Sequence, residues 1–256
     1  MTDKAKVTAA IIVIGDEVLS GRTQDTNVQF LALALGELGI RIREVRIIPD
    51  VTDEIVETVN VMRGKHDYVF TTGGIGPTHD DITTAAVSKA FGRAMIRNPE
   101  AEAILLSNYK PGDVTEARMK MADTPDGDDV VLISNPVSKA PGYQVENVFV
   151  MAGVPRIMQA MFDDLKSRLT GGTPVASRSI DAFIPEGRVA GPLGQVQKDF
   201  PDIDIGSYPF VRIGQLGTCL VARSTDAAAL DEVEAAICEM IKALGGEPND
   251  PTKPKK

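Results

Sequence analysis

The chain has 256 residues, of which 43% are hydrophobic and 25% are charged, so a globular protein with a sizeable core is expected. Its formal net charge of -9 disfavours nucleic acids and anionic membranes as general partners, because an acidic surface repels phosphate. The 2 cysteines form no CxxC pair and there are only 2 histidines, which argues against a disulfide framework and a structural zinc site. No signal-peptide or membrane-spanning pattern is found, so a cytoplasmic protein is expected.

The first part of the chain alternates between strand patterns and helix patterns. Residues 7–14 form a short, β-branched apolar run, which is typical of a strand buried on both faces. Apolar residues at helical spacing then predict a helix over residues 27–38, with Asn27 as its cap and Gly39 after its end. The same patterns predict strands at 40–48 and 68–72 and helices at 53–62 and 81–91. This alternation predicts βαβ units, with a mostly parallel sheet between two layers of helices.

The pattern becomes less regular after residue 98. The elements predicted in this part are helices at 101–107 and 115–122, strands at 130–134 and 147–151, and a closing helix at 155–169. Met119 and Met121 are assigned to ordinary helix packing. Gly171, Gly172 and Pro174 then mark a linker, so a first domain covering residues 1–170 is expected.

The remainder of the chain has the order of a small α+β domain, expected over residues 171–246. Its predicted elements are strands at 179–184, 203–208 and 218–223 and helices at 193–200 and 227–244. Residues 247–256 contain prolines and lysines but no aliphatic residue, so this tail is predicted to be disordered. The fold class is therefore α/β: a three-layer αβα domain followed by a small α+β domain.

A glycine-rich loop follows the third predicted strand and reads, over residues 71–83, TTGGIGPTHDDIT. In a parallel α/β sheet this position, beyond the carboxyl end of a strand, is where ligands bind. Glycines let successive N–H groups approach one anion, and the helix that follows adds its own free N–H groups. The loop matches neither common nucleotide motif, because it lacks the Gly-Lys-Ser/Thr of a P-loop and has His79 where GxGxxG requires glycine.

Acidic residues follow all three strands at the same predicted edge of the sheet. Asp16 and Glu17 follow the first strand, Asp50 follows the second, and Asp80 and Asp81 belong to the glycine-rich loop. Clustered carboxylates repel one another, and a hard divalent cation such as Mg²⁺ would relieve the repulsion and bridge to phosphate.

Each of these residues also has a structural interpretation. Asp81 is placed to cap the next helix, whereas Asp80 has no such role. The Asp16–Glu17 pair is compatible with a solvated turn, Asp25 or Asn27 with a helix cap, and His79 with an ordinary loop residue.

Three segments together resemble a known family: GDEVLSG at 15–21, DTN at 25–27 and the loop at 71–83. They are similar to the MoaB/Mog-type molybdopterin-binding domain, and most similar to its form at the N-terminus of competence/damage-inducible CinA proteins. A related domain accompanies eukaryotic FAD synthases. The resemblance covers about residues 7–169 and implies a three-layer α/β fold that binds a phosphorylated pterin, such as molybdopterin, or a nucleotide. It also implies a homo-oligomer.

The resemblance implies which residues form the site. Catalytic and metal-binding roles fall on Glu17, Asp80 and Asp81, with Mg²⁺, Mn²⁺ or Co²⁺ as the divalent metal. The implied ligand-binding residues come from the same segments and from two later loops: Gly15, Asp16, Gly21, Asp25, Asn27, Asp50, Thr72, Gly73, Gly74, Gly76, Pro77, Thr78, Asn135, Lys139, Pro141, Gly142 and Gly153.

Three positions in two segments depart from the family pattern. Ala152 stands where the family usually has proline, and Ser138-Lys139 replaces the usual Gly-Thr. Lys139 is compatible with a phosphate contact and with simple exposure. Three functions stay open: a molybdopterin-binding protein of cofactor biosynthesis, a metal-dependent pyrophosphatase acting on ADP-ribose-like compounds, and a binding module without catalysis. The amidase domain of full-length CinA proteins is not expected in this chain.

Overall fold

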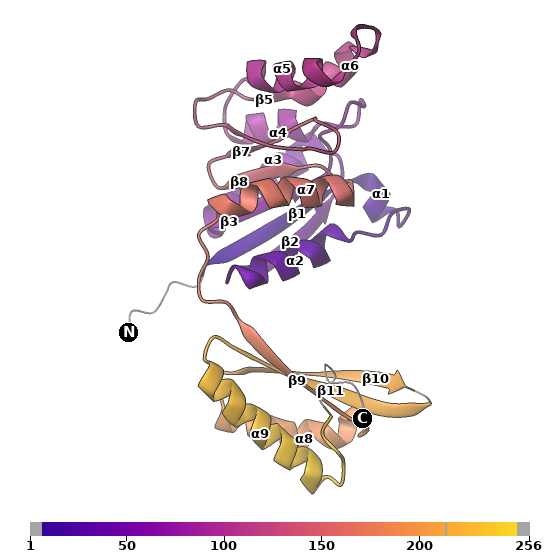
Figure 1. The fold of residues 1–256 in the computed structure, drawn as a ribbon, viewed down its shortest axis with the longest axis vertical. Helices are drawn as coiled ribbons and strands as arrows, with labels where there is room; N and C mark the ends of the chain where they lie inside the picture. Colours follow the sequence, from indigo (N-terminus) through magenta and orange to yellow (C-terminus); the bar gives the residue numbers. More distant parts are fainter. Residues whose placement is uncertain (1–6, 213, 250–256) are drawn as a thin grey trace. The chain divides into compact units, whose positions relative to one another are not determined.

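The chain divides into two compact units, with the boundary between Gly172 and Thr173. We describe them from a computed structural model, in which residues 7–212 and 214–249 are placed (Figure 1). Among these residues, no helix has the length and apolar character that crossing a lipid bilayer requires.

The first unit is built on a six-stranded sheet with the order β2-β1-β3-β8-β7-β6. The strands are β1 (Thr8–Ile14), β2 (Arg41–Ile48), β3 (Tyr68–Thr72), β6 (Val131–Ile133), β7 (Gly142–Val145) and β8 (Val148–Met151). Neighbours from β2 to β8 run parallel, whereas β7 runs antiparallel to both β8 and β6. The prediction of a mostly parallel sheet is therefore confirmed. The short hairpin strand β7 was not predicted.

Helices cover both faces of this sheet. Helices α3 (Thr52–Lys65) and α4 (Thr83–Ala90) pack on one face, and α2 (Asn27–Glu37) and α7 (Pro155–Leu165) pack on the other. Successive residues of β1 alternate between the two cores: Ile12 packs with the α3–α4 side and Ile11 with the α2–α7 side. Because both faces are covered, the strand is apolar from Ala9 to Ile14, and the predicted three-layer α/β class is confirmed.

Shorter elements complete the first unit. They are α1 (Asp16–Leu19), β4 (Met95–Arg97), α5 (Pro99–Asn108), η1 (Pro111–Asp113), α6 (Glu116–Met119), η2 (Lys120–Ala122), β5 (Asp123–Pro125) and η3 (Lys166–Arg168). Strands β4 and β5 pair antiparallel in a small separate sheet. A local core that includes Leu105 and Met119 holds α5 and α6 together.

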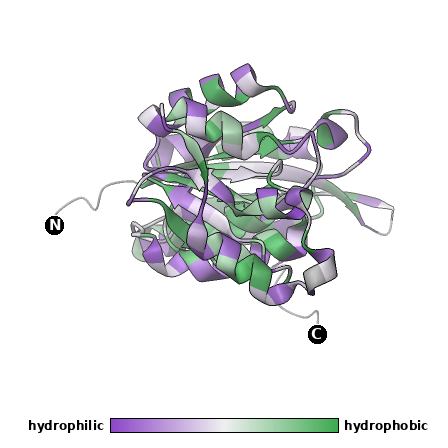
Figure 2. Cartoon of the chain, turned by 90° about the horizontal axis from the view of Figure 1, so that it is seen from above, coloured by the Kyte–Doolittle hydropathy of each residue, from purple (hydrophilic) through white to green (hydrophobic). Residues whose placement is uncertain are grey.

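The second unit is the small α+β domain that the sequence predicts. It contains β9 (Ala176–Ala182), α8 (Glu186–Asp199), β10 (Asp204–Arg212), β11 (Gln215–Ser224) and α9 (Ala227–Ala243). The antiparallel sheet has the order β10-β11-β9, and α8 and α9 cover one of its faces, as Figure 1 shows. In Figure 2, hydrophobic and hydrophilic stretches alternate along the helices, as expected of helices with one buried side.

Two details of the second unit differ from prediction. Helix α8 begins at Glu186 rather than at residue 193, because Val189, Leu193 and Val196 are all buried on one side of it. Asn249 pairs with Asp181 through reciprocal backbone hydrogen bonds of 2.7 and 2.8 Å, so disorder is the wrong description of this residue. Residues 250–256 of the predicted tail lie outside the described residues.

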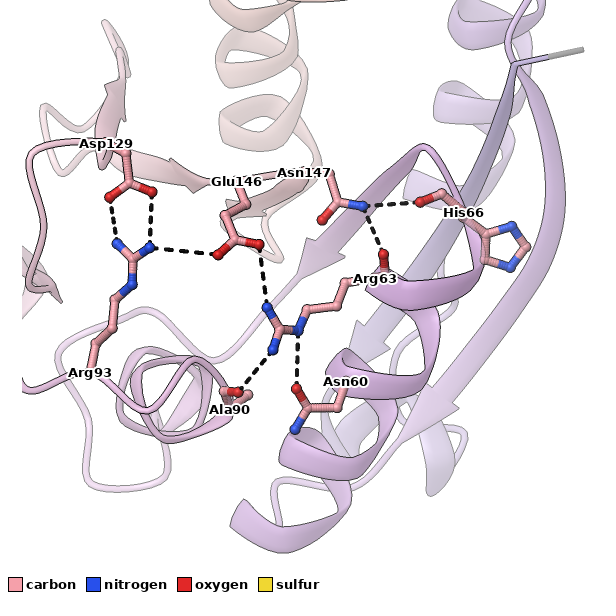
Figure 3. A network of polar contacts seen from close by, with 8 residues as sticks. All are labelled: Asn60, Arg63, His66, Ala90, Arg93, Asp129, Glu146 and Asn147. Atoms are coloured by element: carbon pink, nitrogen blue, oxygen red, sulfur yellow. Dashed lines mark hydrogen bonds and ion pairs between the residues drawn. The ribbon is translucent and has the colours of Figure 1, made fainter. Parts of the chain in front are cut away.

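A polar network lies before the amino ends of β3 and β8 (Figure 3). Arg93 forms a two-pronged ion pair with Asp129, and both Arg93 and Arg63 reach Glu146. Asn147 donates to the carbonyl oxygens of Arg63 and His66, at 3.0 Å each. This network stabilises the end of the sheet that is remote from the strands' carboxyl ends.

Candidate functional site

A pocket of about 550 Å³ opens at the carboxyl edge of the parallel strands. Gly73 to Pro77 form one wall directly after β3, and Ala152 to Pro155 form another directly after β8. Asn135, Ser138 and Ala140 contribute a third wall. The position agrees with the general rule that open α/β sheets bind ligands beyond their strand ends.

The glycine-rich loop is fixed by its backbone. Gly73 and Gly74 have φ angles of 105° and 68°, which favour glycine. A Cβ atom on Gly73 would lie 2.1 Å from the carbonyl oxygen of Ile14, and one on Gly74 would lie 2.1 Å from the Thr83 hydroxyl. The Thr83 hydroxyl donates to the carbonyl oxygen of Gly73 at 3.0 Å. Both glycines are therefore required by close packing as well as by conformation.

Some amides of the loop are free and others are used. The Gly73 N–H donates to Met151 and the Thr78 N–H to the Asp81 carboxylate. The N–H groups of Gly74, Ile75 and Gly76 donate to no other group in the part of the chain that the structure describes. The free donors are therefore consecutive and belong to residues that line the pocket.

Asp81 does not cap a helix, so that interpretation is wrong. Helix α4 begins at Thr83 and its N-cap position is Ile82. The Asp81 carboxylate instead accepts hydrogen bonds from the Thr78 N–H at 2.8 Å and from the Thr78 hydroxyl at 2.5 Å. It lines the pocket next to Gly76, where a Cβ atom would lie 2.7 Å from it.

The acids that follow β1 and β2 lie close together. The Asp50 carboxylate accepts from the Asp16 N–H at 3.0 Å. Burial raises the pKa of Asp50, and the negative charges of Asp16, Glu17 and Asp80 raise it further, against the effect of that hydrogen bond. Glu17, on α1, lines the pocket and places its carboxylate against Gly15.

Asp80 does not line the pocket, unlike Glu17 and Asp81. Its side chain is 65% exposed. The nearby Thr78 hydroxyl, followed by weaker influences that include His79 and Lys120, lowers the pKa of Asp80. No three side chains of the types Asp, Glu, His and Cys are arranged to hold a metal anywhere in residues 7–212 and 214–249. The structure therefore does not assemble Glu17, Asp80 and Asp81 into a ready-made metal site.

The DTN segment positions the loop after β8. Asn27 is the first residue of α2 rather than its cap, so that interpretation is wrong, and Asp25 accepts from the Val28 N–H at 2.9 Å. The buried Asn27 donates through Nδ2 to the carbonyl oxygen of Gly153 at 2.8 Å. Asp25 and Asn27 also line a smaller recess of about 40 Å³, together with Thr72.

Asn135 shapes the loop between β6 and β7. Its Oδ1 accepts from the N–H groups of Val137 and Ser138, and its Nδ2 donates to the carbonyl oxygen of Ala140 at 2.8 Å. Lys139 is exposed and has a φ of 66°. Of the predicted site residues, those that line the large pocket are Glu17, Gly73, Gly74, Gly76, Pro77, Asp81, Asn135 and Gly153. Those outside its lining are Gly15, Asp16, Gly21, Asp25, Asn27, Asp50, Thr72, Thr78, Asp80, Lys139, Pro141 and Gly142.

The apolar wall of the pocket was not predicted. Ile75, Met121, Val154, Ile157 and Met161 all line it. Met121 is thus a pocket residue as well as part of the helical packing. Ile157 and Met161 lie one turn apart on α7, a spacing that in sequence cannot be told from ordinary core packing.

The first unit is thus a three-layer α/β domain with a glycine-rich loop and a candidate binding pocket at its strand ends. Residues 10–171 match the family described as "Probable molybdopterin binding domain", which is well over half of the chain, so the chain belongs to this family. Residues 174–247 match the family described as "FAD synthase, middle domain".

Individual relatives agree with this assignment. A protein of Pyrobaculum calidifontis is 38% identical over 216 residues, covering 79% of this chain and 80% of the relative. A "CinA-like protein" of Desulfosudis oleivorans is 30% identical over 252 residues, covering 93% of this chain and 60% of the relative. A "Probable FAD synthase" of Caenorhabditis elegans is 30% identical over 261 residues, and this chain spans 50% of its length.

A solved structure is also similar. It is the protein CinA of Thermoplasma acidophilum, described as having unknown function, with a TM-score of 0.60 and 32% identity over 64% of this chain and 99% of that one. The resemblance to the MoaB/Mog-type domain and to the N-terminal region of CinA proteins is thus confirmed.

Proposed function

We propose that the pocket binds a phosphorylated pterin or a nucleotide. The observation that carries this proposal is the run of free N–H groups from Gly74 to Gly76, which lies on one wall of a largely apolar pocket. Successive backbone donors suit a phosphate group, because they supply hydrogen bonds without a competing side chain. The apolar wall around Ile157 and Met161 suits a flat ring. Molybdopterin and AMP-containing compounds both have this combination.

A divalent metal belongs to the same proposal. The donors are carboxylate oxygens, which Mg²⁺ and Mn²⁺ prefer, and Glu17 and Asp81 line the pocket. Because two carboxylates are too few to fill the coordination sphere of a cation, phosphate oxygens of the ligand would supply further metal ligands. Glu17 and Asp81 would hold the metal, with Asp80 as a further candidate, and the metal would offset phosphate charge near the acids.

The test is calorimetry of the full chain with molybdopterin, AMP and ADP-ribose, each with Mg²⁺ and with a chelator. At least one compound is expected to bind, and more tightly with Mg²⁺. Asp81→Asn is expected to remove most of the Mg²⁺ effect, whereas Asp163→Asn, on the exposed side of α7, serves as the control. Equal affinity with Mg²⁺ and with the chelator would exclude the metal. No binding of any of the three would exclude the proposed function.

Metal-dependent hydrolysis of an ADP-ribose-like pyrophosphate is a second candidate. Burial raises the pKa of Asp50, and repulsion by the charges of Asp16, Glu17 and Asp80 raises it further. A cation near these acids would offset the repulsion, which favours this candidate. Water would attack one phosphorus atom and the bridging P–O bond would break, giving AMP and ribose 5-phosphate. Release of AMP from ADP-ribose with Mg²⁺, Mn²⁺ or Co²⁺ tests this. Binding without turnover would identify a non-catalytic module.

Assembly and location stay predictions. A homo-oligomer follows only from the resemblance, and light scattering of the purified chain tests it. A cytoplasmic location follows from composition, and fractionation of cells that express the protein tests it.

A further inference from the structure

The small recess beside the large pocket contains buried polar atoms without partners. It has a volume of about 40 Å³ and shares Glu17, Thr23, Gly153 and Pro155 with the large pocket, so the two adjoin. Its remaining lining includes Asn27, at the start of α2, and Thr72, the last residue of β3.

Asn27 and Thr72 each present an unsatisfied oxygen here. Asn27 is 3% exposed and Thr72 is 1% exposed, and neither Asn27 Oδ1 nor Thr72 Oγ1 has a hydrogen-bond partner among the described residues. The orientation of the Asn27 amide is fixed, because its Nδ2 donates to the carbonyl oxygen of Gly153. A buried polar atom without a partner is costly, and its presence at a pocket indicates a group that is still to be bound.

The chemistry of the recess selects what can enter. Glu17 and Asp25 also line it, and one oxygen of Asp25 is already used by the Val28 N–H. Asn27 Oδ1 can only accept a hydrogen bond, whereas the Thr72 hydroxyl can accept as well as donate. Together with the carboxylates, these acceptors disfavour phosphate in the recess and favour a hydrogen-bond donor. Since one water needs roughly 10–15 Å³ on this measure, there is room for a small group and not for a ring.

We propose that this recess is a subsite for a hydrogen-bond-donating group of the ligand, either a hydroxyl or an amino group. The proposal rests on the proposed function of the large pocket and adds the direction in which the ligand lies. The phosphate lies at the free amides of residues 74–76, and the donor end of the same molecule lies at Asn27 Oδ1 and Thr72 Oγ1. The ligand thus has one orientation, because each end is excluded from the site of the other.

Thr72→Val tests the subsite, and its neighbour gives a matched control. Valine removes the hydroxyl and keeps the shape, and no hydrogen bond within the described residues is lost. Thr71 is 0% exposed and its hydroxyl is also unpartnered in that part of the chain, but it lines neither cavity. Thr71→Val therefore controls for the loss of a buried hydroxyl from the same strand. Thr72→Ser keeps the hydroxyl and controls for folding.

The readout is calorimetry with ligands that contain or lack the donor. One arm compares AMP with 2′-deoxy-AMP and 3′-deoxy-AMP, and the other compares a pterin monophosphate with its analogue lacking the 2-amino group. In one arm the wild type is expected to bind the complete ligand about tenfold more tightly than the analogue. Thr72→Val is expected to lose that preference, whereas Thr71→Val and Thr72→Ser keep it. The arm that responds identifies the donor as hydroxyl or amino.

Three results would overturn the subsite. In the first, the wild type binds complete ligand and analogue equally in both arms. In the second, Thr72→Val keeps the full preference, which places the donor elsewhere. In the third, Thr72→Val lowers the melting temperature but leaves affinity unchanged, which identifies a structural water in the recess. If the wild type binds none of molybdopterin, AMP, ADP-ribose and the pterin monophosphate, the proposed function fails as well, so the two failures are distinguishable.

Discussion

Gly73 is the position where a single added atom should matter most. Its φ is 105°, and a Cβ atom at this position would lie 2.1 Å from the carbonyl oxygen of Ile14, which leaves no space for a side chain. Gly73→Ala is expected to lower the free energy of unfolding by roughly 1–3 kcal/mol, through backbone strain and displacement of β1. Urea denaturation measures the effect. Gly64→Ala is the control, since Gly64 lies in α3 with open space around it and alanine should stabilise that helix by about 0.5–1 kcal/mol. Equal stability of Gly73→Ala and wild type would contradict this account.

The segments that surround the pocket could be predicted from the sequence better than the contacts that their residues make. Asn27 and Asp81 both precede or begin helices, so local rules assign them to caps. The partner of Asn27 is Gly153, which only the tertiary fold brings near. The partner of Asp81 is Thr78, which depends on the conformation of the loop. The glycines were predictable because their chemistry is local. The apolar wall was not, because an amphipathic pattern is the same for a core face and for a pocket face.

Glu44 links the edge strand β2 to the end of α3. Its carboxylate accepts from Lys65 at 2.5 Å and from Arg46 at 2.9 Å, and it lies 3.5 Å from His66 Nε2. These contacts, Lys65 first and Arg46 next, lower the pKa of Glu44 from 4.5 to about 2. A carboxylate whose pKa is lowered on folding contributes stability above its unfolded pKa, and that contribution disappears as the pH falls through its folded pKa.

Glu44→Gln is therefore expected to be less stable than the wild type at pH 7. The difference should persist down to about pH 4.5 and disappear as the pH approaches 2. Urea denaturation across this range measures it. Glu37→Gln, which removes a carboxylate at the exposed end of α2, is the comparison. A constant difference at every pH would show that the Glu44 charge is not responsible.

Local features of the sequence explain why the start of α8 and the strand β7 were not predicted. Helix α8 contains Pro192 and several glycines, which in sequence indicate a break, yet the buried stripe of Val189, Leu193 and Val196 outweighs them. Strand β7 is four residues long and pairs as a hairpin with β8, so it is too short for a clear alternation. Strand β1 was predictable because burial on both faces imposes a continuous apolar run from Ala9 to Ile14.

At the scale of the whole molecule, the two units have separate hydrophobic cores. Ile12 and Phe162 belong to the cores of the first unit, whereas Leu220 and Ile237 belong to the core of the second. Every residue that lines the large pocket belongs to the first unit. A chain ending at Gly172 is therefore expected to fold and to keep the ligand affinity of the full chain.

Thermal unfolding, followed by circular dichroism, measures whether the shortened chain folds. Calorimetry with a compound that the full chain binds measures its ligand affinity. A single cooperative transition and unchanged affinity are expected, since no core residue of the first unit is removed. An unfolded product would show that the second unit stabilises the first, and a folded product with weakened binding would show that it contributes to the site.

The order of strands in the large sheet could be predicted only in outline. Alternating strands and helices require crossovers and hence parallel neighbours, which accounts for β2, β1 and β3. The position of β8 next to β3 depends on pairings between residues far apart in the chain, such as Val69 with Val148. Such pairings follow from tertiary packing and leave no local pattern.

The backbone contact between Gly73 and Gly153 has a consequence for how this pocket can diversify. A Cβ on Gly153 would lie 3.2 Å from the Cα of Gly73, so two main-chain segments meet there with no side chain between them. The pocket surface at this contact is consequently made of main chain, whereas Met121 and Ile157 contribute side chains elsewhere in the lining. Mutation can exchange those side chains one at a time without rebuilding the main-chain part. Under the proposed function, a library restricted to those side chains would change the preference for the ring of the ligand and leave the backbone of the glycine-rich loop unchanged.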